Sequence, residues 1–291
     1  MSAVGAKMTS NTGLILEGGA IRGIFTAGVL DCLLDKDIYF PYVAGVSVGV
    51  SNASGFISRQ KGRSKKILTH ENTRTFFGLP NILRTGRVLD LDECIIKYAY
   101  DNFPYDFETF HKSETLWEAV VANCETGEAE YVHDFKDDAE TLEFCKASCS
   151  LPFICKPINL RGKKYLDGSL ADSIPFQRAL DMGCEKILLV LTKADLHEAT
   201  DYKKLRFLVD MFYRRKYPKL ADTILGRKDQ YLRQMEEIEK MEREGRAMII
   251  KPDETTVAHF ENNKEKLEKC YQDAYKLMER RFGELEAFLK S

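Results

Sequence analysis

Two short apolar runs, each ending in a turn of small residues, restrict the fold of the N-terminal part of the chain. Residues 13–16 (GLIL) indicate a buried strand, residues 21–36 show helical spacing, and residues 42–46 (YVAGV) indicate a second buried strand. Strand, helix and strand in this order predict a βαβ unit with neighbouring parallel strands. The two glycine-rich turns that follow the strands would then lie at the same edge of a sheet.

The middle of the chain alternates further strand and helix signals. Residues 116–135 predict a hairpin with Thr126 and Gly127 in its turn, and residues 144–170 predict a helix end, a proline-containing loop and a turn-linked strand pair. Residues 186–195 (KILLVLTKAD) carry the strongest buried-strand signal. Residues 67–112 mix helical and loop signals, with an exposed connection expected at 78–87.

The character of the chain changes after residue 195. Charged residues dominate from Asp201 onwards, hydrophobic residues recur at helical spacing, and residues 247–252 (AMIIKP) predict one strand. We therefore expect a three-layer α/β/α domain over residues 12–195, with residues 196–291 forming a mainly helical section packed on it.

Composition excludes several classes of protein. The chain of 291 residues has 44% hydrophobic and 30% charged residues and a net charge of −2, which argues against a disordered chain and against general affinity for nucleic acid. No run approaches the roughly 20 apolar residues of a membrane span, and the N-terminus lacks a secretory h-region. The eight cysteines show no C-x-x-C spacing, so we expect reduced thiols, no zinc site and a cytoplasmic protein.

A G-x-S-x-G pattern, Gly45 to Gly49, stands between the second strand and the helix expected after it. In this setting the two glycines relieve crowding at a sharp turn, so that the Ser47 hydroxyl can stand out at the edge of the sheet. An ordinary glycine-flanked turn is the alternative. The pattern makes Ser47 a candidate nucleophile.

The first turn offers what a serine nucleophile needs beside it. The N–H groups of Gly18, Gly19 and Ala20 could stabilise the oxyanion of acyl transfer, and Arg22 adds positive charge. A nucleotide phosphate cradle is the alternative, but the spacing G-G-x-x-x-G fits neither the Rossmann motif nor the P-loop.

A base is harder to identify from local patterns. Of the five histidines, only His197 and His259 follow Ser47 late enough to resemble the order in an α/β-hydrolase. A catalytic histidine would be expected in a turn of small residues after a strong strand, and only His197, just past residues 186–195, comes near this pattern. Asp167 is the better candidate, because it ends an expected strand in YLDGSL and follows a loop of small residues.

The motifs E-G-G-A-I-R-G, G-V-S-V-G and D-G-S, in this order, resemble the patatin-like phospholipase family. The resemblance extends through ASCSLPFICKPI, ADSIP and LLVLTKAD over roughly residues 12–195 and implies a Ser-Asp dyad in place of a triad. By this resemblance Ser47 is the nucleophile and Asp167 the proton acceptor. The N–H groups of Gly18, Gly19 and Ala20 form the oxyanion hole, and Arg22 helps to shape or charge it. Three positions depart from the usual pattern: Glu17 for aspartate, Ala20 for glycine, and Ser169 after Asp-Gly.

The expected chemistry is hydrolysis of a carboxylic ester of a lipid through an acyl-enzyme, with no metal or cofactor. The carboxylate pairs at Asp90 and Asp92 and at Asp137 and Asp138 are interpreted as solvated faces. Residues 203–219 interleave basic and aromatic residues, which suits peripheral contact with a membrane or, alternatively, a helix packed on the core. A soluble short-chain esterase or thioesterase, and a catalytically silent scaffold, stay open as alternatives.

Overall fold

The computed structural model describes residues 7–8, 11–70, 81–83 and 88–291. Within these residues the main sheet has eight strands, with β6 pairing outside the linear order on β5. The strands from β10 to β5 are parallel, and those beyond β5 are antiparallel. In spatial order they are β10 (Ala247–Ile250), β9 (Lys186–Val190), β2 (Thr12–Leu16), β4 (Tyr42–Val46), β5 (Leu116–Asn123), β8 (Lys163–Asp167) and β7 (Ile158–Leu160), with β6 at Ala129–Val132 and a separate pair β1 (Lys7–Met8) and β3 (Ile38–Tyr39).

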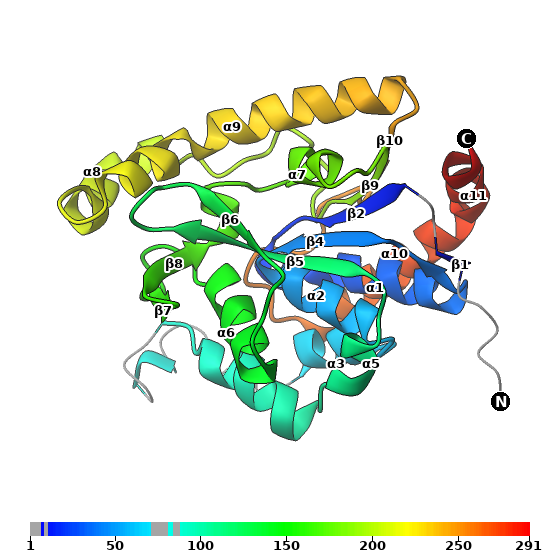
Figure 1. The fold of residues 1–291 in the computed structure, drawn as a ribbon, viewed down its shortest axis with the longest axis horizontal. Helices are drawn as coiled ribbons and strands as arrows, with labels where there is room; N and C mark the ends of the chain where they lie inside the picture. Colours follow the sequence, from blue (N-terminus) through cyan, green and yellow to red (C-terminus); the bar gives the residue numbers. More distant parts are fainter. Residues whose placement is uncertain (1–6, 9–10, 71–80, 84–87) are drawn as a thin grey trace.

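Helices cover both faces of this sheet, giving the expected three layers (Figure 1). One face carries α1 (Gly23–Asp35), α2 (Val48–Ile57), α3 (Arg63–Thr69), α5 (Phe107–His111), α6 (Asp138–Ser148), α10 (Lys264–Arg280) and α11 (Phe282–Lys290). The other carries α7 (Phe176–Asp181) and the long α9 (Pro218–Arg243), which α8 (Arg206–Val209) precedes. A π-helical segment, Asp92–Asn102, adjoins α6.

Alternation along the central strands builds two hydrophobic cores. Leu14 and Leu16 of β2 point into the core beneath α1, α2 and α10, whereas Ile15 between them joins the core beneath α7 and α9. This is the period of two that a strand imposes on its side chains. All three residues are fully buried, so β2 lies at the centre of the molecule.

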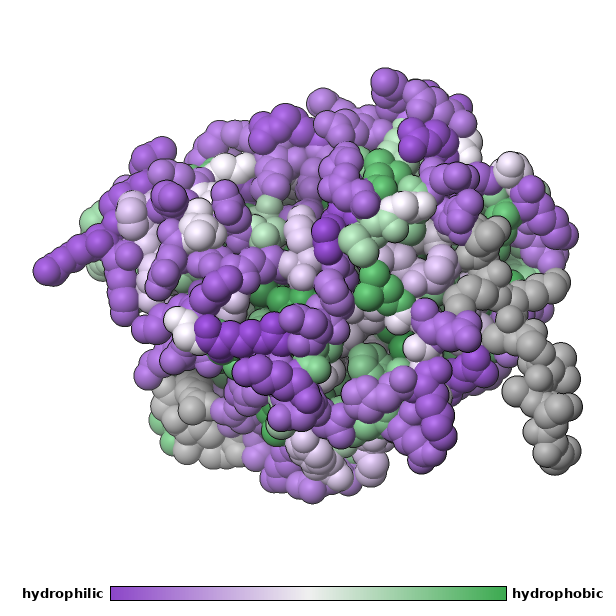
Figure 2. All heavy atoms as spheres, in the orientation of Figure 1, coloured by the Kyte–Doolittle hydropathy of each residue, from purple (hydrophilic) through white to green (hydrophobic). Residues whose placement is uncertain are grey.

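The C-terminal section contacts the rest of the fold on both faces and at an edge. Strand β10 extends the sheet beside β9, α9 covers one face, and α10 packs along α1 on the other. The predicted strand at 247–252 is confirmed as β10, two residues shorter. On the face drawn in Figure 2, hydrophilic residues dominate the outer surface and hydrophobic ones show mainly between the elements.

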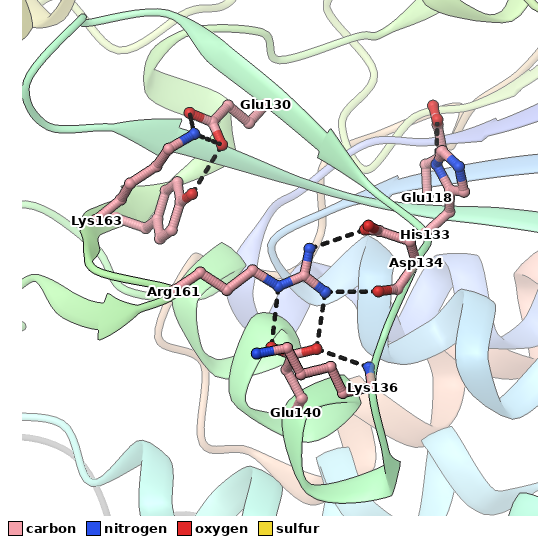
Figure 3. Close-up of polar contacts among 9 residues, drawn as sticks. Glu118, Glu130, His133, Asp134, Lys136, Glu140, Arg161 and Lys163 are labelled. Carbon is pink, nitrogen blue, oxygen red and sulfur yellow. Dashed lines mark hydrogen bonds and ion pairs between the residues drawn. The ribbon is translucent and has the colours of Figure 1, made fainter.

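Ion pairs anchor the antiparallel part of the sheet (Figure 3). Arg161, in the turn between β7 and β8, donates to Glu140 of α6 at 2.9 Å and to Asp134 after β6 at 2.9 Å. The guanidinium of Arg161 lowers the pKa of Glu140 to about 2. Lys163 of β8 binds Glu130 of β6 at 3.0 Å. These contacts tie the β7–β8 hairpin to α6 and β6. Helix α6 also packs against β8, and both elements deliver residues to the site described below.

Most of the expected elements are confirmed with small shifts of their ends. The mixed signals over 67–112 resolve into the π-helical segment and α5, while most of the expected connection at 78–87 lies outside the described residues. The eight cysteines all lie within the described residues, and they form no disulfide there. Among the described residues, no helix combines the length and the apolar character that crossing a bilayer requires.

Candidate active site

Ser47 occupies a strained turn between β4 and α2. Its φ of 54° lies in the left-handed region, which a residue with a Cβ adopts at a cost of about 1 kcal/mol or more. Its flanking glycines make the turn possible: a Cβ on Gly45 would lie 2.6 Å from the Gly49 carbonyl, and one on Gly49 would lie 2.4 Å from the Leu16 oxygen. The serine is 7% exposed, so the turn presents its hydroxyl within a recess.

Asp167 ends β8 and is fully buried. The sheet brings it near Ser47, because Val46 of β4 lies opposite Val120 of β5, while the next residue, Val121, lies opposite Asp167. The Ser169 N–H donates to Asp167 Oδ1 at 2.9 Å. Asp167 Oδ2 is buried and has no hydrogen bond of standard geometry among the described residues. That oxygen is therefore available to the Ser47 hydroxyl.

Burial raises the pKa of Asp167, because desolvation disfavours the carboxylate. Hydrogen bonding from the Ser169 N–H and the Ser47 hydroxyl, together with the charge of Arg227, opposes the rise in pKa. The carboxylate is thus a stronger base than an exposed aspartate, which makes it better matched to a serine proton.

The loop after β2 lies directly against Ser47. A Cβ on Gly18 would be 2.9 Å from the Ser47 Cβ, and a Cβ on Gly19 would be 2.4 Å from Thr192 Oγ1. The N–H groups of Gly18, Gly19 and Ala20 donate no hydrogen bond within the described part of the chain, whereas the next N–H, on Ile21, donates to a carbonyl of the C-terminal section. Three free donors therefore line the turn that faces the serine.

Arg22 lies beside this loop but engages the C-terminal section. Its Nε donates to the Val257 carbonyl at 3.0 Å, and its Nη1 pairs with Glu198 at 3.2 Å. The guanidinium is therefore held in place with its charge balanced. Arg22 contributes to the wall of the site and to the position of the loop after β2.

Two cavities meet at Ser47. Ala20, Ser47, Leu151, His259 and Phe260 line both. The first, of about 440 Å³, extends over α2 and has walls made mainly of apolar side chains, among them Ile67, Leu68, Leu91, Ile95, Leu142 and Leu267. The second, of about 390 Å³, has mixed walls, in which Pro152, Phe153 and Ile154 lie beside a set of charged and polar residues. We call it the polar cavity after that set, which is Glu17, Arg22, Thr192, Lys193, Glu198 and Arg227. An ester at Ser47 could place an apolar part on one side and a polar part on the other.

The patatin-like phospholipase family model matches residues 14–180, more than half of the chain. The chain belongs to the patatin-like phospholipase family. A second family model, a domain of unknown function (DUF6363), matches residues 217–290. The patatin-like part thus contains Ser47 and Asp167, and the second part contains α9, β10 and α10.

Curated relatives of this patatin-like chain share part of its length. The uncharacterized protein YjjU of Escherichia coli is 30% identical over 184 residues, which are 62% of this chain and 51% of YjjU. Lysophospholipase NTE1 of Meyerozyma guilliermondii is 26% identical over 193 residues, 64% of this chain and 13% of NTE1. The match thus spans about half of YjjU and a small part of NTE1. The crystal structure of VipD from Legionella pneumophila has a similar fold, with a TM-score of 0.51, 13% identity and coverage of 96% of this chain and 67% of VipD.

The two candidate histidines lie in different places in this patatin-like fold. His197 lies 3.5 Å from Glu239 and lines neither cavity. His259 lines both, and burial, with help from the charge of Arg22, lowers its pKa. The structure therefore places His259, but not His197, at the site.

Three residues near Ser47 received no role from the sequence. Ser148 Oγ accepts a hydrogen bond from the Ser47 N–H at 3.0 Å, which fixes the turn. Glu17, a departure from the family pattern, is buried, accepts from the Thr192 N–H at 2.8 Å and pairs with Lys193 at 3.3 Å, so it joins the ends of β2 and β9. Arg227 comes from α9, far along the chain. The small-residue loop before β8 hinted at Ser148, but no local signal marked Arg227.

No metal centre is visible in the part of the chain that the structure describes. No three His, Cys, Asp or Glu side chains there group closely enough to hold an ion. Asp92 instead pairs with Lys146 at 2.8 Å, and Asp137 caps α6 by accepting from the Glu140 N–H.

Proposed function

We propose that this chain hydrolyses carboxylic esters of lipids, with Ser47 as nucleophile and Asp167 as proton acceptor. The observation that carries the proposal is the position of Ser47: a serine in a strained turn, beside a buried carboxylate, where an apolar and a polar cavity meet. Membership of the patatin-like phospholipase family supports lipid acyl hydrolysis in general, and so does the similarity to a protein named lysophospholipase NTE1.

The proposed reaction needs only groups of the chain, the ester and water. Asp167 takes the Ser47 proton as Oγ bonds to the ester carbonyl carbon, and the negative charge on the carbonyl oxygen is met by N–H groups of Gly18, Gly19 and Ala20. Each such donor lowers the barrier by about 3 kcal/mol. The proton then passes to the leaving alcohol as its bond to carbon breaks. Water attacks the acyl-enzyme, Asp167 takes its proton and returns it to Ser47, and the carboxylic acid leaves.

The aromatic segment at 203–219 provides a candidate contact with the lipid surface. Phe207 and Phe212 are 77% and 57% exposed, with Leu205 and Met211 also exposed nearby. Tyr213 and Tyr217 are instead buried in the core beneath α9, so the segment divides its aromatic residues between solvent and protein interior. Basic residues around the exposed pair suit an anionic surface, and we include peripheral docking through this segment in the proposal.

Covalent labelling by a fluorophosphonate, followed by intact mass, tests the nucleophile. We expect labelling of the wild type, none of Ser47→Ala, and turnover of lipid esters lost in both Ser47→Ala and Asp167→Asn. Ser51→Ala is the matched control, since Ser51 lines the apolar cavity one helical turn away. Labelling that persists in Ser47→Ala would place the nucleophile elsewhere.

The competing base is tested in the same assay. His259→Ala should keep most of the turnover if Asp167 accepts the proton, whereas turnover lost in His259→Ala and kept in Asp167→Asn would transfer that role to His259. Esters of increasing chain length separate a lipid hydrolase from a short-chain esterase or thioesterase, because the 440 Å³ apolar cavity should favour longer chains. A chain that neither reacts with the probe nor turns over any ester would be a silent scaffold.

A further inference from the structure

Among the described residues that line the polar cavity, one cation has no carboxylate within ion-pair distance. Arg22 pairs with Glu198 at 3.2 Å, and Lys193 pairs with Glu17 at 3.3 Å. Arg227 lines the same cavity, and no acidic side chain among the described residues forms an ion pair with it. Its charge acts on Asp167 only from a distance, where it opposes the rise in pKa that burial causes in that carboxyl. The cavity therefore carries an unmatched positive charge beside the reacting serine.

Arg227 is held in place by the loop that follows Asp167. Its Nε donates to the Ser169 carbonyl at 2.7 Å, which leaves the two terminal nitrogens without a hydrogen bond among the described residues. Two further residues of α9 contact the same loop: Gln230 donates to the Ala171 carbonyl, and Gln234 donates to Asp172 at 2.6 Å. Spacings of three and four residues put these side chains on one face of α9. The guanidinium is thus oriented before any ligand arrives.

We propose that Arg227 binds a phosphate group on the leaving alcohol of the ester, while the acyl chain occupies the apolar cavity. A guanidinium with two free nitrogens matches the geometry of phosphate oxygens and binds them more strongly than a neutral donor does. The preferred substrate is then an acyl ester of a phosphorylated alcohol rather than a neutral acylglycerol. This inference rests on the proposed function, because it assigns the polar cavity to the alcohol part of the substrate.

The inference also gives the C-terminal part of the chain a role. Arg227, His259 and Phe260 all lie within residues 217–290, the range that the family model of unknown function matches. Through these residues that part forms one wall of the polar cavity. It would therefore select the substrate of a reaction carried out by residues of the patatin-like part.

A substrate pair isolates the phosphate. We would compare kcat/KM for 1-octanoyl-glycerol 3-phosphate and for 1-octanoyl-glycerol, which share the ester and the chain. Wild type should prefer the phosphate ester by roughly ten-fold or more, as expected for a hydrogen bond to a charged group, and Arg227→Gln should reduce this ratio towards one through KM. Arg227→Lys should recover part of the preference. The control is Lys228→Gln, which removes a cation one position along α9 that forms only a long ion pair, 4.0 Å, with Asp201.

Two results would overturn the inference: an unchanged ratio in Arg227→Gln, or an equal loss on both esters, which would make Arg227 a positioning residue for Asp167. Repeating the comparison with palmitoyl chains in vesicles separates a lipid headgroup, for which the preference persists, from a water-soluble phosphorylated alcohol, for which it does not.

The phosphate subsite can also be tested separately from ester hydrolysis. If wild type turned over neither ester, calorimetric titration with glycerol 3-phosphate would decide the phosphate subsite alone. Binding by wild type that is lost in Arg227→Gln would support the subsite, and no binding by wild type would reject it.

Discussion

Ala20 has a φ of 50°, in the left-handed region where a Cβ is penalised. The sequence raised this point, because the family pattern has glycine at this position, and the structure shows that the backbone there does favour glycine. Ala20→Gly should therefore raise the free energy of unfolding by up to about 1 kcal/mol, which urea denaturation can measure. Ala27→Gly, in the middle of α1, is the control and should lower stability by a similar amount. An Ala20→Gly variant less stable than the wild type would contradict the claim that the backbone of Ala20 is strained.

The buried carboxylate of Asp167 should lower the stability of the folded protein at neutral pH. Burial raises its pKa in the folded state, so the protonated form is favoured there. Its contribution to stability is complete below the ordinary pKa of about 3.9 and is lost as pH rises through the raised value. Asp167→Asn, which stays neutral, should therefore be more stable than wild type at pH 7, with the difference vanishing below about pH 4.

Urea unfolding between these two pH values checks this prediction, with Asp181→Asn at an exposed position as the control. If Asp167→Asn were no more stable than wild type at pH 7, hydrogen bonds and the charge of Arg227 would offset the desolvation of the carboxylate fully. The same raised pKa moves the acidic limb of the pH–rate profile upwards, because the base must lose its proton before it can act.

For the segment around α8, the sequence was consistent with both membrane contact and packing on the core. Replacing Phe207 and Phe212 together by serine should lower binding to vesicles of phosphatidylcholine and phosphatidylglycerol by at least about ten-fold, since each buried phenylalanine contributes roughly 1.5–3 kcal/mol. Sedimentation with vesicles measures this. Met182→Ser, an exposed apolar residue after α7, is the control and should bind like the wild type. Equal binding by all three proteins would remove this segment from the proposal.

Elements with strong local patterns were predictable. The strand at 42–46 is confirmed without a shift, and the helix after Ser47 begins where the G-x-S-x-G turn demands it. The division within 203–219 was not predictable, because residue type alone favours burial of the phenylalanines over the tyrosines, and the structure shows the reverse. Tyr213 and Tyr217 are buried only because α9 and the β8 side of the sheet meet them.

The two parts of the chain fit together most tightly where α1 crosses α10. A Cβ on Gly28 would lie 2.4 Å from the Tyr271 carbonyl oxygen and 2.9 Å from the Ala274 Cβ. Gly28→Ala should therefore destabilise the protein by about 1–3 kcal/mol through overpacking. Gly226→Ala in α9, where nothing lies within 4 Å, should instead add about 1 kcal/mol through helix propensity. Urea unfolding of both variants checks this; equal effects would mean that the helices can move apart.

The sequence by itself determined the local features of this protein. The βαβ unit, the strained turn at Ser47 and the small residues at 18–20 follow from short-range rules on apolar periodicity, glycine and steric crowding. Those rules act over a few residues, so one chain was enough to locate them. They also singled out Asp167 as a strand-end carboxylate, but not its burial.

Only the tertiary structure decided what surrounds Ser47. Asp167 reaches it because β5 lies between β4 and β8, Ser148 because α6 is tied to β8, and Arg227 because α9 crosses the opposite face of the sheet. Ser148 lies 101 positions after Ser47, and Arg227 contacts Ser169, which lies 58 positions before it. The geometry of these contacts therefore depends on sheet order and packing. No pattern within a few residues encodes that order, which is why the two cavities, and the unbalanced cation in one of them, became visible only in the folded chain.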